Sequence, residues 1–66
     1  LFNSAKLKVT MNDYAGALAD YNKTIDLFPY FIEAYYERGK LKETMHDDNR
    51  AKADYKLAKM MSDVDK

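Results

Sequence analysis

An internal repeat constrains this sequence more than any other feature. When the 66 residues are shifted by 34 positions against themselves, 10 of the 32 resulting pairs are identical and no gap is needed. The identical pairs include Lys6–Lys40, Leu7–Leu41, Lys8–Lys42, Ala17–Ala51, Asp20–Asp54 and Tyr21–Tyr55. Composition alone gives about two identical pairs, so the chain contains a duplicated structural unit.

Each unit is predicted to form two helices. The first helices are expected over residues 2–11 and 31–45, which contain no proline and at most one glycine each. The second helices are expected over 14–28 and 48–62. Pro29 ends the first unit, because a proline disfavours helical geometry at the residue before it. Only a few residues separate consecutive helices, so neighbouring helices are expected to pack antiparallel.

The turns inside the two units carry matching signals. Asp13 and Asp47 stand where a helix begins, and their carboxylates can accept hydrogen bonds from free backbone N–H groups of the first turn. Asn12 and His46 precede them, where the first helix of each unit must end. That position favours a left-handed φ, which asparagine tolerates well and at which histidine is enriched. We therefore predict left-handed backbone at Asn12 and His46.

The composition bounds the class of protein. A 66-residue chain is long enough for one small domain, covering 1–66, and its 47% hydrophobic content is too high for a disordered chain. The 11 basic and 11 acidic side chains balance, and no apolar run is long enough to span a membrane. We therefore expect no nucleic-acid partner and no membrane partner. Cysteine is absent, which excludes disulfides and fits a reducing or an oxidising compartment equally.

Small and aromatic residues recur at fixed places in both units. A small residue lies in each first helix, and a large residue lies four positions before it. In each second helix an alanine is followed four residues later by an aromatic. These residues are Ala5 and Gly39, Leu1 and Tyr35, Ala17–Tyr21 and Ala51–Tyr55, with Pro29 closing the first unit. At a period of 34 residues, the pattern resembles that of the tetratricopeptide repeat family. The resemblance implies that two helices approach closely at Ala5 and at Gly39.

The resemblance implies an all-α fold, in which two helix-turn-helix repeats form an antiparallel four-helix fragment of a right-handed solenoid. Repeat one would cover about residues 1–30, and repeat two about residues 31–62. Two kinds of position depart from the family pattern: polar residues replace an apolar one at Ser4 and Arg38, and lysines replace an aromatic at Lys8 and Lys42.

The second helices of the two units differ on one face. In residues 14–28 this face is an apolar stripe, which would cover the next unit of a solenoid. In the second unit the equivalent positions are mostly polar, so residues 47–62 resemble a capping helix. We therefore expect the array to end with this unit and any further repeats to precede Leu1. The stripe consists of Tyr14, Leu18, Tyr21, Ile25 and Phe28, and its equivalents are Asp48, Lys52, Tyr55, Lys59 and Ser62.

No arrangement of residues indicates catalysis. His46 is the only histidine, and Thr44 is the nearest hydroxyl residue in sequence, so no paired nucleophile and base can be recognised. His46 is more simply explained as a turn residue. The run from His46 to Asn49 lacks the spacing and the glycine of a calcium loop. We expect no catalytic residue, no cofactor and no metal site, and the chain is not expected to be an enzyme.

The resemblance also implies a binding surface. Tetratricopeptide arrays line a concave groove with their first helices and hold extended or helical peptides there. The matching positions recur at spacings of three and four residues, so each set shares one helix face. An ordinary solvated helix face is the alternative interpretation. The predicted groove residues are Phe2, Asn3, Lys6, Val9 and Thr10 in the first unit, and Glu33, Tyr36, Glu37, Lys40 and Glu43 in the second.

Two aromatic rings beside the closing proline form a second candidate surface. Phe28 precedes Pro29 and Tyr30 follows it, whereas the family usually has polar residues there. Large exposed rings favour a partner. The alternative is local packing of both rings against the stems of Lys23 or Lys59.

Taken together, these features predict a scaffold module of a larger protein that binds protein or peptide segments. The alternative is a structural role, in which the chain forms a homodimer or docks within its own longer polypeptide. A two-repeat array has little interface between repeats, which favours further repeats or a symmetric dimer.

Overall fold

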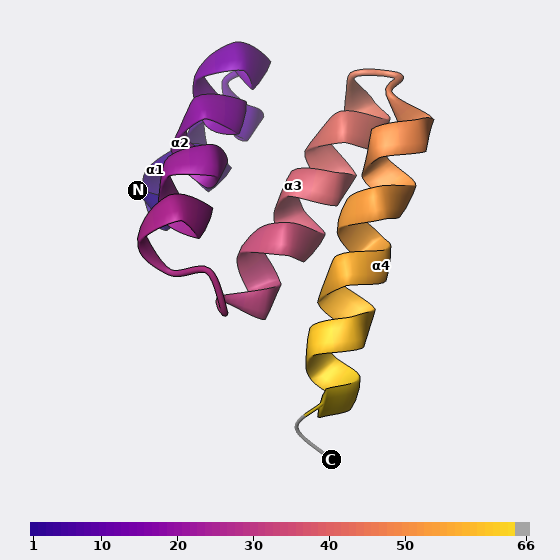
Figure 1. The fold of residues 1–66 in the computed structure, drawn as a ribbon. Helices are drawn as coiled ribbons and strands as arrows, with labels where there is room; N and C mark the ends of the chain where they lie inside the picture. Colours follow the sequence, from indigo (N-terminus) through magenta and orange to yellow (C-terminus); the bar gives the residue numbers. More distant parts are fainter. Residues whose placement is uncertain (65–66) are drawn as a thin grey trace.

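The computed structural model describes residues 1–64 and shows an all-α chain (Figure 1). No strand occurs within those residues. The predicted helices are confirmed, with boundaries that differ by no more than two residues. The four helices are α1 (Phe2–Thr10), α2 (Tyr14–Leu27), α3 (Ile32–Thr44) and α4 (Asp48–Val64).

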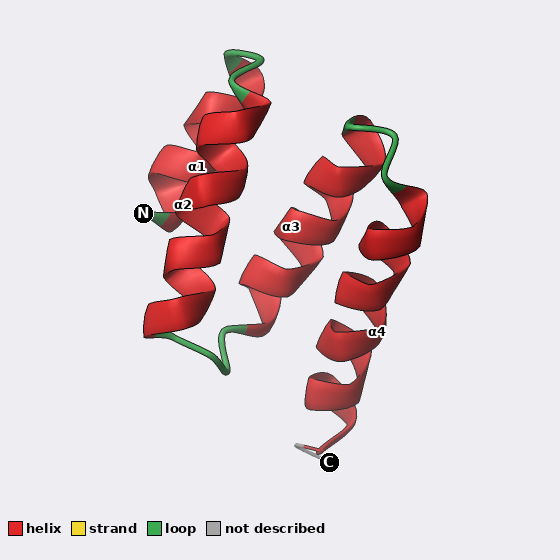
Figure 2. Cartoon of the chain, turned by 45° about the horizontal axis from the view of Figure 1, so that its top comes forward, coloured by secondary structure: helices red, strands yellow, loops and turns green. Residues whose placement is uncertain are grey.

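The helices form two antiparallel pairs that lie side by side. In Figure 1, α1 and α2 make one pair, with α1 behind α2, and α3 and α4 make the other. Short loops join all four elements (Figure 2). Packing is chiefly between consecutive helices: α1 with α2, α2 with α3, and α3 with α4. The arrangement is therefore an open row of helices, because a closed four-helix bundle would also pack α1 against α4.

The two turns inside the helical pairs have the same geometry. Asn12 has φ 62° and His46 has φ 64°, and these are the only residues other than glycine with positive φ in the described chain. The left-handed backbone predicted at both positions is confirmed. Asp13 then caps α2, since its carboxylate accepts a hydrogen bond of 3.1 Å from the N–H of Gly16. Asp47 stands at the equivalent place immediately before α4.

The loop between the pairs is organised around Pro29. Helix α2 ends at Leu27, two residues before the proline, as the restriction on the residue preceding proline predicts. The Tyr35 hydroxyl donates a hydrogen bond of 2.9 Å to the Pro29 carbonyl oxygen. The Phe31 N–H donates to the Phe28 carbonyl oxygen at 3.0 Å. These contacts hold the loop against the start of α3.

The core is built largely from small residues. Ala5, Ala17, Tyr21 and Leu41 form one buried cluster, which joins α1, α2 and α3. Gly39 is buried against α4, and a Cβ atom placed on it would lie 2.8 Å from a ring carbon of Tyr55. Such a separation is shorter than van der Waals contact allows, so the helices can approach this closely only with glycine. Ala5 and Gly39 therefore lie where close approach was predicted.

Each repeat contains an ion pair between its two helices, formed by the lysines at the equivalent positions 8 and 42. The Lys8 ammonium lies 2.9 Å from the carboxylate of Asp20, and the Lys42 ammonium lies 3.0 Å from that of Asp54. Asp54 also receives two hydrogen bonds from Arg38, at 2.7 and 3.0 Å. The two helices of each repeat are thus joined by an electrostatic contact at the same place.

These contacts change the pKa values of the paired groups. The hydrogen bond between Lys8 and Asp20 raises the pKa of the Lys8 ammonium group. The same hydrogen bond lowers the pKa of the Asp20 carboxyl group. Burial of Asp54 opposes its charged form, but hydrogen bonds from Arg38 and Lys42 outweigh burial and lower the pKa of its carboxyl group. The carboxylates therefore stay ionised at neutral pH.

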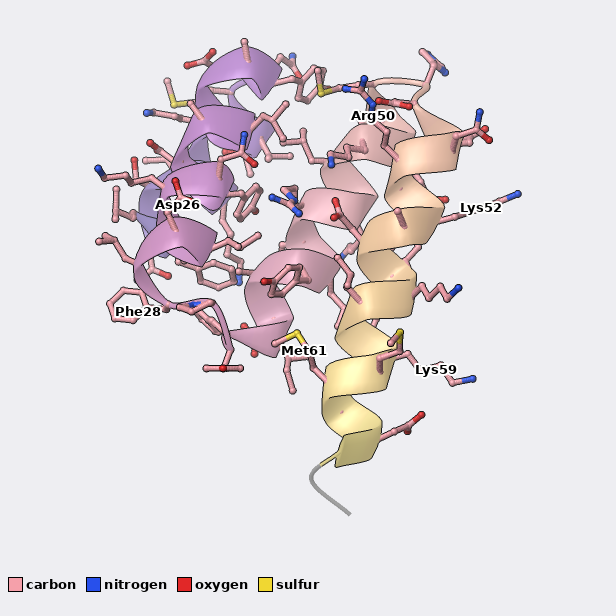
Figure 3. All side chains as sticks on the ribbon, in the orientation of Figure 1. Asp26, Phe28, Arg50, Lys52, Lys59 and Met61 are labelled. Atoms are coloured by element: carbon pink, nitrogen blue, oxygen red, sulfur yellow. The ribbon has the colours of Figure 1, made fainter. Side chains whose placement is uncertain are left out.

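The apolar stripe predicted on α2 is largely covered. Tyr21 is buried, whereas Tyr14, Leu18 and Ile25 are half-buried and only Phe28 is exposed. The equivalent positions on α4 are exposed except for the half-buried Tyr55. In Figure 3 the side chains of Lys52 and Lys59 point from α4 away from α3. The described part of α4 thus presents a polar outer face.

Candidate functional site

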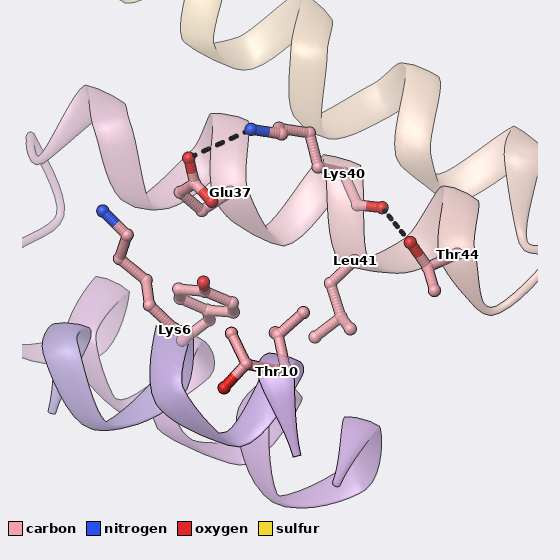
Figure 4. Close-up of a pocket in the computed structure, with 8 residues that line it drawn as sticks. Lys6, Thr10, Glu37, Lys40, Leu41 and Thr44 are labelled. Atoms are coloured by element: carbon pink, nitrogen blue, oxygen red, sulfur yellow. Dashed lines mark hydrogen bonds and ion pairs between the residues drawn. The ribbon is translucent and has the colours of Figure 1, made fainter. Parts of the chain in front are cut away.

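A pocket of about 290 Å³ lies between α1 and α3. Figure 4 shows the two helices on opposite sides of it, with Lys6 extending from α1 toward Glu37. Five of the predicted groove residues line the pocket, which places both first helices on one concave surface. The lining residues are Lys6, Val9, Thr10, Tyr21, Glu37, Lys40, Leu41 and Thr44.

The rim of the pocket carries both signs of charge. The Lys40 ammonium lies 3.4 Å from the Glu37 carboxylate, one helical turn away on α3. On the opposite side, the Lys6 ammonium lies 5.3 Å from the centre of the Phe2 ring, within the range of a cation–π contact. The rim can therefore accept an acidic group at Lys6 and a group of either charge near the Glu37–Lys40 pair.

The floor of the pocket is mainly apolar. Tyr21 and Leu41 reach it from the buried core cluster, and Val9 adds a half-buried aliphatic side chain. Burial, with the nearby charge of Glu37 as a second cause, raises the pKa of Tyr21 to about 12. The phenol therefore stays neutral at physiological pH. Sequence reasoning missed Tyr21 and Leu41 as pocket residues, because their helical positions predict core packing.

Phe2 and Tyr36, both predicted in the groove, lie outside the pocket lining and pack against other rings. Phe2 is half-buried, with ring-centre distances of 4.7 Å to Phe31 and 5.8 Å to Tyr21. Tyr36 is exposed, and its ring centre lies 6.1 Å from that of Tyr55 on α4. Phe2 thus helps to join the two repeats. Phe31 is half-buried and packs against Phe2.

The remaining predicted groove residues also lie outside the pocket lining. Asn3 and Glu33 are exposed at the beginnings of α1 and α3. The Glu43 carboxylate accepts a hydrogen bond from the Tyr55 hydroxyl of α4. Burial and this hydrogen bond raise the pKa of Tyr55 to about 12. The structure therefore brings together the central part of the predicted groove and separates its ends.

The second candidate surface lies at the loop between the helical pairs. Phe28 is 59% exposed and Tyr30 is 86% exposed, and together with Leu27, Pro29 and Phe31 they line a shallow, almost wholly apolar hollow. Figure 3 shows Phe28 and Lys59 on opposite sides of the molecule. The alternative in which lysine stems cover both rings does not fit this exposure. We call Leu27, Phe28 and Tyr30 the loop patch.

The described residues contain neither a group placed to bind a metal ion nor a helix able to span a membrane. Among residues 1–64, no group of three or more His, Asp or Glu side chains is placed to hold a metal ion. In the same part of the chain, no helix has the length and apolar character needed to cross a membrane.

Compared with known proteins, the chain matches no family model, no curated protein and no solved structure.

Proposed function

We propose that this chain is a tetratricopeptide-type scaffold module, which binds a protein or peptide segment in the pocket between α1 and α3 and performs no chemistry. The observation that carries the proposal is the composition of the pocket: an apolar floor lies beneath a rim of mixed charge. Binding sites for peptides commonly combine an apolar surface with a few polar groups that fix orientation. The 34-residue period supports the family assignment.

The pocket suits a segment with one apolar side chain next to an acidic one. The apolar side chain would lie on Val9 and Leu41, and the acidic group would approach the Lys6 ammonium. Lys40 would contribute less, because Glu37 already neutralises part of its charge. A volume of about 290 Å³ holds one or two side chains, so the backbone of the ligand would run along the surface.

A peptide screen with matched variants tests this proposal. Fluorescent peptides that combine an apolar and an acidic residue are titrated with the chain, and binding is followed by anisotropy. We expect Lys6→Ala to weaken binding, whereas Lys52→Ala, which removes a lysine that points outward from α4, should leave binding unchanged (Figure 3). Equal affinities for both variants, with helicity preserved, would rule out the pocket as the binding site.

Self-association through the loop patch is the second candidate function. The exposure of Phe28 and Tyr30 favours it, because contiguous exposed aromatic surface is typical of interfaces. Light scattering coupled to size-exclusion chromatography, recorded over a series of protein concentrations, distinguishes self-association from peptide binding by a monomer. A dimer that is lost on changing Phe28 and Tyr30 to Ser would support assembly, and a monomer of 7.7 kDa at all concentrations would contradict it.

A further inference from the structure

Helix α4 carries a row of exposed apolar residues on the side turned away from α3. The buried residues Ala51 and Ala58 mark the side that packs on α3. Ala53, Leu57 and Met60 follow one another at i, i+4 and i+7, and at about 100° per residue they form one line on the other side of the helix. Ala53 is exposed, Leu57 is 43% exposed and Met60 is 54% exposed. We call Ala53, Leu57 and Met60 the α4 stripe.

The packing of one repeat on the next leaves this side of the second helix uncovered. Leu57 and Met60 are exposed although the first helical pair lies beside the second (Figure 1). In repeat one the equivalent positions are Ala19, Lys23 and Asp26, and all three are exposed although α3 packs on α2. This side is therefore separate from the faces that join the repeats. It is largely polar in repeat one and apolar in repeat two.

Positively charged side chains border the α4 stripe on both sides. Lys56 lies one turn before Met60 on one flank, and Arg50 lies one turn before Ala53 on the other. Both cations are exposed. Among residues 1–64, no ion pair engages Lys56, and the Arg50 guanidinium lies 3.6 Å from the Asp47 carboxylate. The stripe is thus an apolar line between two cationic flanks.

The remaining exposed surface of α4 is also positively charged. Lys52 and Lys59 lie on the polar outer face and point away from α3 (Figure 3). Of the acidic residues in the helix, Asp54 is buried and paired with cations of α3, which leaves Asp48 and Asp63 exposed. Four exposed cations therefore oppose two exposed carboxylates. Because the whole chain is neutral, this excess of positive charge is local to α4, and it favours an acidic partner.

We infer that the α4 stripe is a docking site for an acidic amphipathic helix of another protein. The apolar residues of that helix, spaced by three and four, pack on Leu57 and Met60, and its acidic residues lie near Lys56 and Arg50. The stripe spans about 10 Å, which matches two turns of a partner helix. No residue of α4 lines the pocket between α1 and α3, so the inference does not rest on peptide binding there.

Two other occupants fit the α4 stripe less well. A second copy of this chain has its three glutamates on α3, which exposes one large apolar residue within its span, Tyr36. A single ring does not supply an apolar row. A lipid surface binds helices with large residues such as Trp, Phe or Leu along the apolar face, whereas Ala53 occupies one of the three positions here. The row and the charges together therefore favour an acidic partner helix.

A designed peptide tests the inference. The probe is a fluorescein-labelled helix of about 18 residues, with Leu at spacings of three and four, Glu on both flanks and Ala elsewhere. It is titrated with the complete chain while anisotropy is recorded. We expect saturable binding that weakens as NaCl is raised from about 50 to 500 mM. A peptide with Lys in place of every Glu should not bind, because it repels the flanks of the stripe.

Variants of the chain locate the binding surface. Leu57→Gln should weaken binding about tenfold, since burial of one leucine side chain is worth at least that factor in affinity. Lys56→Glu should weaken it as well, because a repulsive contact replaces an attractive one. Lys23→Glu is the matched control: it changes the net charge equally at an exposed position of α2 and should leave binding nearly unchanged. Circular dichroism checks that each variant is folded.

Three outcomes would overturn the inference. The first is the absence of saturable binding by the Glu peptide. The second is equal binding by the parent chain and the folded Leu57→Gln variant, and weakening by Lys6→Ala instead would place the peptide in the pocket between α1 and α3. The third is a homodimer of the chain that Leu57→Gln dissociates, which would show that a second copy covers the α4 stripe. Failure of the pocket in its own peptide screen leaves the result at α4 unaffected.

Discussion

Lys42 of α3 lies 3.0 Å from the carboxylate of Asp54, which is 2% exposed, and the pair joins the two helices of repeat two. The same pair occurs one repeat earlier as Lys8 and Asp20, at 2.9 Å. The two pairs differ in their surroundings. Asp54 is more deeply buried than Asp20 and also binds Arg38, so repeat two depends more strongly on its carboxylate.

We therefore expect Asp54→Asn to destabilise the fold by about 3 kcal/mol, because it leaves two largely buried cations without a counter-charge. Asp20→Asn, the equivalent change in repeat one, should cause a smaller loss, because Lys8 is more accessible to water. Urea denaturation followed by circular dichroism measures the loss in the free energy of unfolding for each variant. Equal losses for the two variants would contradict the different roles of the pairs.

The Asp54 carboxylate should also make stability depend on pH in the acid range. The pKa of Asp54 in the folded chain lies below its ordinary value of 3.8, so the unfolded chain binds a proton more readily. The free energy of unfolding contributed by this group is fully present above about pH 4 and is lost as the pH falls through the folded pKa. Urea midpoints recorded from pH 7 downward test this. In Asp54→Asn the acid-dependent loss should be smaller than in the parent chain.

The buried phenol of Tyr21 predicts a loss of stability in the alkaline range. Its pKa is raised from 10.0 to about 12 in the folded chain, so the unfolded chain releases this proton first. The contribution to stability is complete below pH 10 and decreases between pH 10 and about 12. Tyr21→Phe should flatten this decrease. Tyr55→Phe should act in the same direction. The free energy of unfolding is measured by urea denaturation between pH 10 and about 12. If it decreases as steeply in the double variant Tyr21→Phe/Tyr55→Phe as in the parent chain, the two phenols do not cause the alkaline loss of stability.

Close packing of α3 on α4 predicts that added volume is not tolerated at Ala51. This residue is 1% exposed, so Ala51→Leu should destabilise the fold by about 1–3 kcal/mol through overpacking. Ala53 lies two residues further along α4 and is exposed, so Ala53→Leu is a matched control with an expected change within about 0.5 kcal/mol. Thermal melting compares the two variants. Similar melting temperatures would contradict the observed packing.

The sequence predicted the helices and their turns well, because these features depend on local chemistry repeated at a fixed period. The left-handed backbone at Asn12 and His46 follows from the need to end one helix immediately before an aspartate cap. The burial of Ala5 and Gly39 follows from the absence of a large side chain where helices touch. The turn predictions required no knowledge of tertiary contacts, whereas the close approach at Ala5 and Gly39 was implied by the resemblance to a repeat family.

The ion pairs were missed, although the sequence contained a signal for them. Lys8, Lys42, Asp20 and Asp54 are all among the residues that are identical at the 34-residue shift. A lysine lies in each first helix and an aspartate in each second helix, so opposite charges are duplicated together. Recognising the pairing required the relative rotation of the two helices, which helical periodicity alone does not determine.

The candidate site was predicted only in part, for a similar reason. Lys6, Val9, Glu37 and Lys40 line the pocket because the middle turns of α1 and α3 face each other. Phe2 belongs to the same helix face, but its ring packs against Phe31 near the start of α3. That contact depends on how the Pro29 loop directs the chain, which only the folded structure shows.

Packing chiefly between consecutive helices also bears on how the chain reaches its fold. Within residues 1–64 the main interfaces join consecutive helices, so the entropy lost in closing loops is small for most of the packing. Proteins dominated by such local contacts fold within about microseconds to milliseconds. We therefore expect that either helical pair can form first and serve as the template on which the other assembles.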